Sequence, residues 1–399
     1  MQAEPSSPAA AGPLAGLRVL DCTHVVAGSL CSMILADLGA DVVKIESPQG
    51  DMLRARLGSR GFASFPFMNR NKRSLAIDMS RPDAQEVLRT LADSVDVFVE
   101  NYRPGALDRL GLGYAHLSAR NPRLVYCSIS GFGRTGPYSK RGGFDVTAQA
   151  MSGLMSFAGE PGARPVQHPA PISDYTAALH AAIGVLAALR ERESSGMGQH
   201  VEATLIGSAL LHTTLQLGEY LTNGYVAKPE GTQGSGGMPY GVFATADRYL
   251  VIAAAGDSLW QRTAAVLGDP ELLADPRFAS HSSRSTHREA LRERIEAILA
   301  EAGAGEWAER LSAAGVPVGI VNTVAEAAAD PQLEHLGAIV EVGDERYLAT
   351  PINLSRSGTS VRSGTASLGE HSRQILAEAG FGADEIDAMA AAGLIAGPG

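Results

Sequence analysis

The sequence predicts an α/β fold built around a parallel β-sheet. In the first half of the chain, short apolar runs alternate with helical patterns. Gly39 directly follows the first predicted helix, and Pro82 stands at the first position of another, as glycine and proline commonly do. Strands in alternation with helices favour parallel pairing through right-handed crossovers. The predicted class is therefore α/β, with a Rossmann-like large domain and a smaller α+β domain.

The elements of the large domain can be placed in order. Apolar β-type runs and helical periodicity predict strands at 17–21, 41–46, 74–78, 97–101, 124–130 and 199–204 and helices at 30–38, 84–91 and 205–221. An almost wholly apolar helix begins at Ser173-Asp174 and runs to about Leu189. A helix that is apolar on all sides is typically buried, so this one is expected in the core.

A second unit follows a stretch rich in glycine and proline. Strands are expected at 249–254 and 318–321, and helices at 257–267, 285–301 and 304–314. The predicted divisions are a disordered tail (1–13), a large domain (14–225, completed by about 345–399), a small domain (241–330) and two linkers (226–240 and 331–344).

Composition limits the possible functions. The chain has 399 residues and a net charge of −10, which argues against a nucleic-acid-binding surface. Its three cysteines lack metal-ligand spacing, so we expect no metal site and a reducing compartment. The apolar run Ala181–Leu189 is too short to span a bilayer. These features predict a cytoplasmic protein that binds neither nucleic acid nor membrane.

Asp174 is the most informative single residue. It stands at the start of the apolar helix, where free N–H groups and the helix dipole stabilise a negative charge. That setting predicts an ionised carboxylate held in place, which suits a nucleophile. Aspartate is also among the best N-cap residues, and this segment alone favours the capping interpretation.

Three other motifs each allow two interpretations. Gly131-Phe-Gly133-Arg-Thr-Gly136 follows a strand but continues as loop, so a nicotinamide or flavin cofactor is not expected. Gly234-Ser-Gly-Gly237 suits either a linker or a mobile cover over a site. A third group, the basic residues near strand ends, suits either a phosphate site or a solvated surface; it comprises Lys72, Arg73, Arg103, Arg109, Arg134, Lys140 and Arg141.

Taken together, these segments resemble the family III CoA-transferases, also called the CaiB–BaiF type, in the superfamily of formyl-CoA transferase and alpha-methylacyl-CoA racemase. The resemblance covers nearly the whole chain and is densest in the first 205 residues. It is carried by the strings at 16–28, 36–46, 69–74, 99–107, 130–137 and 196–202, together with Asp174 and its helix.

The resemblance implies the identity of the site residues. The family's nucleophilic aspartate falls on Asp174, and its glycine loop falls on Gly234, Gly236 and Gly237. Its CoA contacts fall on Val25, Lys72, Asn101, Tyr102, Ala106, Arg109 and Leu110. The resemblance also implies an interlocked homodimer, with the site between the large and small domains.

Two positions depart from other members of the superfamily. Val26 stands where some members carry a glutamine that holds the acyl group, which argues against formyl or oxalyl substrates. Phe144 stands where the racemases carry a histidine, directly before the acidic residue that aligns with Asp145. An acid–base group for epimerisation is therefore missing.

The expected function is transfer of CoA from an acyl-CoA, with succinyl-CoA or another dicarboxyl-CoA as the family-level suggestion, to a free carboxylic acid. Asp174 would form a covalent aspartyl-CoA intermediate. No cofactor is expected, because coenzyme A enters as part of the substrate. The alternatives are an acyl-CoA racemase or lyase of the same superfamily, or a CoA-binding protein without turnover.

Overall fold

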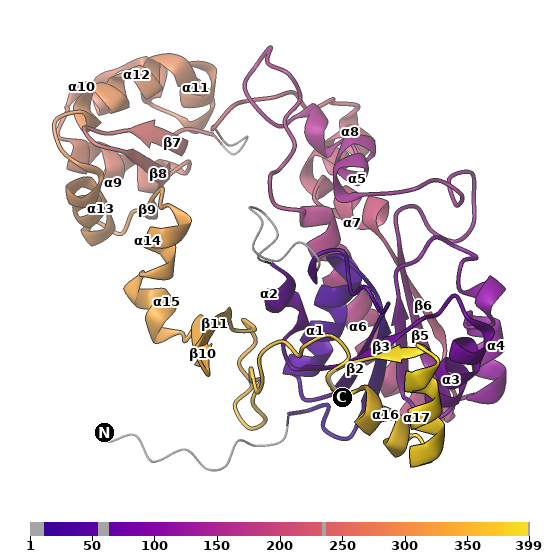
Figure 1. The fold of residues 1–399 in the computed structure, drawn as a ribbon. Coiled ribbons are helices and arrows are strands. Elements are labelled where there is room, and N and C mark those ends of the chain that lie inside the picture. The colour runs from indigo at the N-terminus through magenta and orange to yellow at the C-terminus, as the bar shows by residue number, and fades with distance from the viewer. Residues whose placement is uncertain (1–11, 55–63, 234–236, 398–399) are drawn as a thin grey trace. The chain divides into compact units, whose positions relative to one another are not determined.

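The computed structural model describes residues 12–54, 64–233 and 237–397 (Figure 1). Contacts divide the chain into two compact units. The first holds the chain up to Leu154 together with Gln167–Leu217 and Gln332–Gly399, and the second holds Met155–Val166 and Gly218–Pro331. The short segment 155–166 thus groups with the second unit, although it lies within the predicted range of the large domain (14–225).

The first unit is built on a seven-stranded sheet, as far as the described residues show, in the order β12-β3-β2-β1-β4-β5-β6. Its strands are β1 (Arg18–Cys22), β2 (Asp41–Glu46), β3 (Lys72–Ile77), β4 (Val97–Glu100), β5 (Val125–Ser130), β6 (His200–Thr204) and β12 (Ile395–Ala396). All neighbours pair in parallel except β12, which pairs antiparallel with β3. The predicted α/β class with a large parallel sheet is confirmed.

Helices cover both faces of this sheet, because the strands are apolar on both sides. Val19 packs on the face covered by α1 (Ala27–Asp37) and α6 (Ile172–Ser195). Leu20, the next residue, packs on the other face, which is covered by α3 (Pro82–Ala92), α4 (Tyr114–Arg120), α16 (Ser372–Glu378) and α17 (Ala383–Ala391). Figure 1 shows the C-terminal helices α16 and α17 beside α3 and α4.

The remaining elements of the first unit are short. They are α2 (Phe65–Asn69), the 3-10 helices η2 (Asp108–Leu110) and η3 (Leu154–Ser156, whose last residues belong to the second unit), α5 (Asp145–Met151), α7 (Leu205–Leu211), α15 (Pro331–His335), β10 (Ile339–Val342) and β11 (Glu345–Leu348). The helix predicted at 205–221 is in fact two helices, α7 and α8 (Thr214–Asn223), with His212 and Thr213 between them.

The second unit packs helices against a three-stranded antiparallel sheet in the order β7-β8-β9. Its core contains the buried side chains of Trp260 and Trp307. Its elements are β7 (Tyr240–Ala244), β8 (Tyr249–Ala253), β9 (Val318–Ile320), α9 (Asp257–Leu267), α10 (Glu271–Ala274), η4 (Pro276–Phe278), α11 (His281–Thr286), α12 (Arg288–Leu299), α13 (Ala304–Ala313) and α14 (Val324–Ala328).

Helix α6 is longer than the apolar run Ala181–Leu189, which by itself is too short to span a bilayer. It continues to Ser195 and ends at Gly196, whose φ of +75° suits glycine. By length and composition alone it could cross a membrane, and it is the one such helix among the described residues. The core helices of soluble proteins can be equally long and apolar, and one face of α6 packs in the core against α1. The cytoplasmic location stays a prediction.

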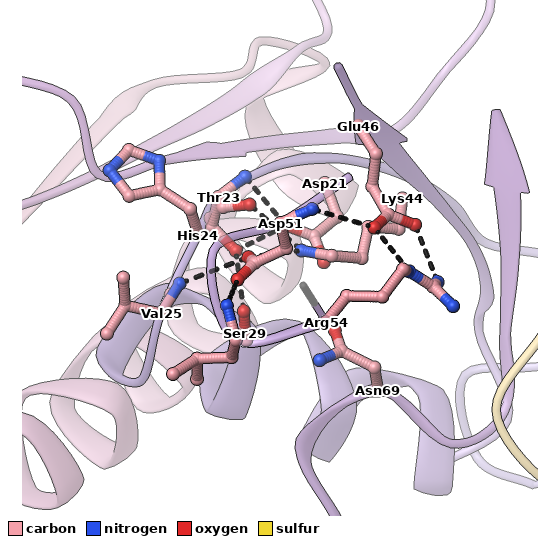
Figure 2. Close-up of polar contacts among 12 residues, drawn as sticks. Asp21, Thr23, His24, Val25, Ser29, Lys44, Glu46, Asp51, Arg54 and Asn69 are labelled. Atoms are coloured by element: carbon pink, nitrogen blue, oxygen red, sulfur yellow. Dashed lines mark hydrogen bonds and ion pairs between the residues drawn. The ribbon is translucent and has the colours of Figure 1, made fainter. Parts of the chain in front are cut away.

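A buried polar network lies beneath the loop that joins β1 to α1 (Figure 2). The fully buried Asp21 accepts a hydrogen bond from Ser32 Oγ at 2.7 Å and pairs with Lys72 Nζ at 2.9 Å. Lys44 Nζ donates to the carbonyl of Thr23 at 2.9 Å. Burial alone would raise the pKa of Asp21, but the two ammonium groups and the neighbouring hydroxyls hold it well below its usual range.

Replacing Lys72 with methionine tests this network. The change leaves Asp21 as a buried carboxylate without its closest cation, so we expect a loss of about 3 kcal/mol or more in the free energy of unfolding. Urea denaturation measures that loss. The control is Arg109→Met, because Arg109 is exposed and its loss should leave stability within about 0.5 kcal/mol. A Lys72→Met variant as stable as the wild type would show that Lys72 does not compensate the buried charge of Asp21.

Candidate active site

A cavity of about 350 Å³ opens at the carboxyl ends of β1, β4 and β5. Its walls are the loop 24–27, the segments 101–104, 129–131 and 141–144, and the side chains of Asp174 and Leu205. The strand order changes direction between β1 and β4. In open α/β sheets ligands bind at such a switch point, outside the carboxyl ends of the strands, so this cavity is the candidate active site.

The β1–α1 loop is shaped by a strained residue. Val25 has a φ of +63°, which is rare for a β-branched residue and costs about 1–3 kcal/mol. Its N–H donates to Asp51 Oδ2 at 3.2 Å, and Asp51 Oδ2 lies 3.6 Å from Lys44 Nζ (Figure 2). The buried network therefore holds the conformation of this loop, and Val25 and Val26 both line the cavity.

Asn101 clamps the same loop from the end of β4. Its Oδ1 accepts from the N–H of His24 at 2.9 Å, and its Nδ2 donates to the carbonyl of His24 at 2.7 Å. The ring of Tyr102 meets the His24 ring edge-on, with centroids 4.8 Å apart. Burial lowers the pKa of His24, which favours the neutral imidazole. The predicted contacts Val25, Asn101 and Tyr102 thus converge on one wall of the cavity.

Three other predicted contacts lie just beyond the cavity wall. Ala106, Arg109 and Leu110 follow Gly105, whose φ is +84°, in the segment that forms η2. Leu110 packs against the core, while Arg109 is exposed. The structure brings this segment next to the chain that lines the cavity at 101–104, with the Arg109 side chain on the surface.

Lys72 is not brought to the cavity. Its ammonium group is buried and donates to Asp21 Oδ2, Ser29 O and Asn69 Oδ1, each at 2.9 Å. Burial lowers the pKa of Lys72 to about 8, although the charge of Asp21 acts in the opposite sense. All three donor protons are used inside the protein, which speaks against the predicted contact with CoA and assigns Lys72 to the support of the loop.

Two residues of the cavity wall, Arg103 and Arg141, belong to the basic group near strand ends, for which the sequence predicts no specific role. Arg103 and Arg141 line the cavity, and among the described residues neither has a carboxylate partner. The Arg141 guanidinium lies over the ring of Tyr138, 4.0 Å from its centroid. Arg103 follows the end of β4 and Arg141 lies in the loop after β5. Their positions in the sequence could have predicted a place in the site, because ligands bind at the carboxyl ends of the strands.

Asp174 is not the N-cap of its helix. It is the third residue of α6, whose N-cap is Pro171, with no side-chain capping bond. Asp174 lines the cavity, and its carboxylate accepts no hydrogen bond from the residues that the structure describes. The capping interpretation therefore fails, and the carboxylate is available for chemistry.

The expectation that Asp174 stays ionised is corrected by its surroundings. Burial, and then the charge of Asp145, raise the pKa of Asp174 to about 7. The helix dipole is a modest effect that falls off within the first turn, and here desolvation outweighs it. At neutral pH the carboxyl group is therefore divided between its two protonation states.

The other predicted acyl-site residues lie in both units. Phe144 lines the cavity with its side chain 70% exposed, and Asp145 follows it as the first residue of α5. Gly237 belongs to the second unit and has a φ of +100°. Gly234 and Gly236 lie outside the described residues, so the predicted glycine cover is not tested. Across the described ranges there is no group of three or more potential metal ligands.

The comparisons decide the family. The model of CoA-transferase family III matches residues 14–372. The chain belongs to this family. It is 34% identical to the succinyl-CoA:glutarate CoA-transferase of Mus musculus, covering 92% of this chain and 86% of the relative. The succinyl-CoA–D-citramalate CoA-transferase of Chloroflexus aurantiacus is also 34% identical, over 92% of this chain and 94% of the relative.

A solved structure agrees with this assignment. A CaiB/BaiF family protein from Brucella suis superposes with a TM-score of 0.86 at 36% identity, covering 92% of this chain and 99% of that one. The family III match and the relatives' names show that the chain is a CoA-transferase. The predicted family and enzyme class are confirmed.

The raised pKa of Asp174 predicts how stability changes with pH. The folded state holds this proton up to about pH 7, while the unfolded chain releases it near 3.8. The stabilisation is complete below the unfolded pKa and is lost as the pH rises through 7. Asp174→Asn removes this partly buried charge, so at pH 8 we expect the variant to be more stable than the wild type by about 1–2 kcal/mol.

Urea denaturation at pH 5 and pH 8 measures this effect, and the advantage of the variant should shrink at the lower pH. If Asp174→Asn were less stable than the wild type at pH 8, the carboxylate would be stabilised by contacts that the structure does not contain.

Proposed function

We propose that this enzyme moves CoA from an acyl-CoA thioester to a free carboxylic acid through a covalent intermediate on Asp174. The observation that carries the proposal is the position of that carboxylate. Asp174 lines the cavity at the switch point of the sheet, and its carboxylate has no hydrogen-bond partner among the described residues. A carboxylate that neither caps its helix nor pairs with a cation is free to act as a nucleophile.

The first half of the reaction loads CoA onto the enzyme. One Oδ atom of Asp174 attacks the thioester carbonyl of the donor, the C–S bond breaks, and the CoA thiolate leaves with the electron pair. The thiolate then attacks Cγ of Asp174 in the mixed anhydride. The bond from Cγ to the bridging oxygen breaks, so the donor acid leaves as a carboxylate and Asp174 holds CoA as a thioester.

The second half reverses these steps with the acceptor. The acceptor carboxylate attacks Cγ of the aspartyl thioester and expels the CoA thiolate, which then attacks the acceptor carbonyl of the new anhydride. Asp174 is released as a carboxylate and the new acyl-CoA leaves. The cycle consumes no electron and no net proton, so coenzyme A enters only as part of the substrate and no resident cofactor is proposed.

We place CoA along the edge formed by the β1–α1 loop and the segment that follows β4. The backbone around Val25 and the side chains of Asn101 and Tyr102 form one wall of the cavity. Arg109 is exposed and has no carboxylate partner among the described residues. A free guanidinium in a protein of net charge −10 is suited to the phosphates of CoA.

A dicarboxyl-CoA is the proposed donor class. The two relatives described above are named for succinyl-CoA. In this chain Arg141 lines the cavity in the segment 141–144, directly before α5, and Asp174 lines the same cavity. An unpaired guanidinium there can hold the distal carboxylate of a short dicarboxyl group by a charge-assisted hydrogen bond.

A homodimer is part of the proposal. Tyr175, Leu179 and Ile183 follow one another at four-residue spacing on α6 and are 41%, 50% and 63% exposed. On α7, Leu210 and Leu211 are 42% and 53% exposed. Such apolar exposure is typical of an interface, and the interlocked homodimer of the family would cover it.

The glycine segment 234–237 is proposed as a cover that keeps water from the intermediates.

The alternatives have less support. Epimerisation of an acyl-CoA needs acid–base groups on both faces of the α-carbon, and Phe144 cannot supply one. A CoA-binding protein without turnover gives no role to the unpartnered Asp174 carboxylate, whereas transfer through an aspartyl thioester requires it. A lyase could use this carboxylate as a base, but the two relatives described above are named as CoA-transferases.

Covalent loading is the direct test of the proposal. Wild-type enzyme incubated with succinyl-CoA and no acceptor should carry a CoA adduct on the Asp174 peptide, and hydroxylamine should convert that residue to the hydroxamate. Peptide mass spectrometry measures both species. Asp174→Asn should fold, since its side chain caps nothing, yet form no adduct and lose transfer at least 10³-fold. A folded variant that retained most of its activity would contradict the proposal.

Replacing Arg141 with glutamine tests the donor class. Loss of a charge-assisted contact to the distal carboxylate should lower kcat/KM for succinyl-CoA about 10–100-fold, with a much smaller effect on acetyl-CoA. Lys140→Gln is the matched control, since Lys140 is exposed and does not line the cavity. Equal losses for both donors would assign Arg141 to the shared CoA part of the substrate.

A further inference from the structure

The first turn of α6 is held by a carboxylate from another helix. Asp145, at the start of α5, accepts the backbone N–H of Ser173 on its Oδ1 at 2.7 Å. The N-cap of α6, Pro171, offers no side-chain acceptor, so a free N–H of this turn is satisfied from outside the helix. Asp174 is the next residue, and its orientation therefore depends on this contact.

Asp145 is itself fixed by a buried side chain one turn further along α5. Gln149 has no exposed surface, and its Nε2 donates to Asp145 Oδ2 at 2.6 Å. The Oε1 of Gln149 accepts the N–H of His168 at 2.9 Å, in the segment that leads to α6. Both carboxylate oxygens of Asp145 are thus engaged, and Gln149 ties α5 to the approach to α6.

This arrangement places two carboxylates at one helix start and satisfies only one of them. Asp145 has two hydrogen-bond donors, while Asp174 has none among the described residues and is desolvated. The charge of Asp145 adds to the cost of ionising Asp174. Once Asp174 carries an acyl group or CoA it is neutral, and that cost disappears.

We propose that Asp145 is the positioning residue of the nucleophile: it fixes the first turn of α6 through Ser173, and its negative charge favours the neutral covalent intermediate over the free carboxylate of Asp174. The proposal rests on the proposed function, in which Asp174 forms that intermediate. Asp145 acts through its neighbours and touches no reacting atom. The other titratable side chains that line the cavity are His24, Tyr102, Arg103 and Arg141.

Asp145→Asn removes the negative charge. Its single side-chain oxygen can still accept from Ser173, but its amide group then faces the Nε2 donor of Gln149, so that contact is lost together with the charge. We expect the pH midpoint of single-turnover loading with succinyl-CoA to fall by about one unit, because Asp174 then ionises more readily. The ratio of loaded to free enzyme at pH 8 should fall several-fold. A folded variant with the wild-type midpoint and the wild-type ratio would overturn the proposal.

Two further variants keep the test decisive. Gln149→Met breaks the clamp but keeps the charge, so loading should slow while the midpoint stays near that of the wild type. Asp83→Asn is the matched control, since Asp83 also lies in the first turn of a helix, α3, on the opposite face of the sheet; it should change neither quantity. If Asp145→Asn failed to fold, Asp145→Ser would take its place.

A measurement that needs no turnover separates this proposal from the proposed function. Urea denaturation at pH 8 of Asp145→Asn, Asp174→Asn and the double variant gives the coupling between the two carboxylates. Repulsion predicts that the effects of the two single replacements on the free energy of unfolding do not add. If Asp145 and Asp174 are coupled but the wild type forms no CoA adduct, the covalent function is wrong, while the repulsion between the two carboxylates is confirmed. An adduct without coupling and without a midpoint shift would overturn the role of Asp145 alone.

Discussion

The site depends on the strained β1–α1 loop and on the buried charges that hold it. Val25 keeps a φ of +63° because Asp51 accepts its N–H and because Asn101 binds both backbone polar groups of the preceding residue. Beneath the loop, the pair of Asp21 and Lys72 fixes the end of β1. Neither ion of that pair could be removed without leaving the other buried and unpaired. This construction opens a cavity at the switch point of the sheet.

The second constraint is electrostatic. A carboxylate at a helix start would ordinarily gain from the dipole and from free N–H groups, yet for Asp174 desolvation outweighs the dipole, and the N–H of Ser173 is taken by Asp145. Its pKa of about 7 makes the carboxylate a stronger base than a solvated aspartate, and in the proposed cycle each covalent intermediate would remove a partly buried charge. On the proposed mechanism the fold would trade some stability for reactivity, as functional sites commonly do.

The sequence was sufficient to predict much of the fold and part of the site. Alternating strands and helices predicted the parallel sheet, and the family motifs identified Val25, Asn101 and Tyr102, which meet at the cavity. The family resemblance places Lys72 among the CoA contacts, but its partner Asp21 lies 51 residues away in the chain, and local pattern cannot reveal that pairing. The antiparallel pairing of β12 with β3 and the capping of α6 by Asp145 are long-range contacts of the same kind.

The central claim is that Asp174 exchanges oxygen with the substrates. In the proposed cycle the acceptor carboxylate attacks Cγ of the aspartyl thioester, and one of its oxygens stays on Asp174 when the new acyl-CoA leaves. Turnover with an acceptor labelled with ¹⁸O in both carboxylate oxygens should therefore place ¹⁸O in the Asp174 peptide, seen by mass spectrometry as a gain of about 2 Da per exchanged oxygen. Product formation with no label in that peptide would contradict the account.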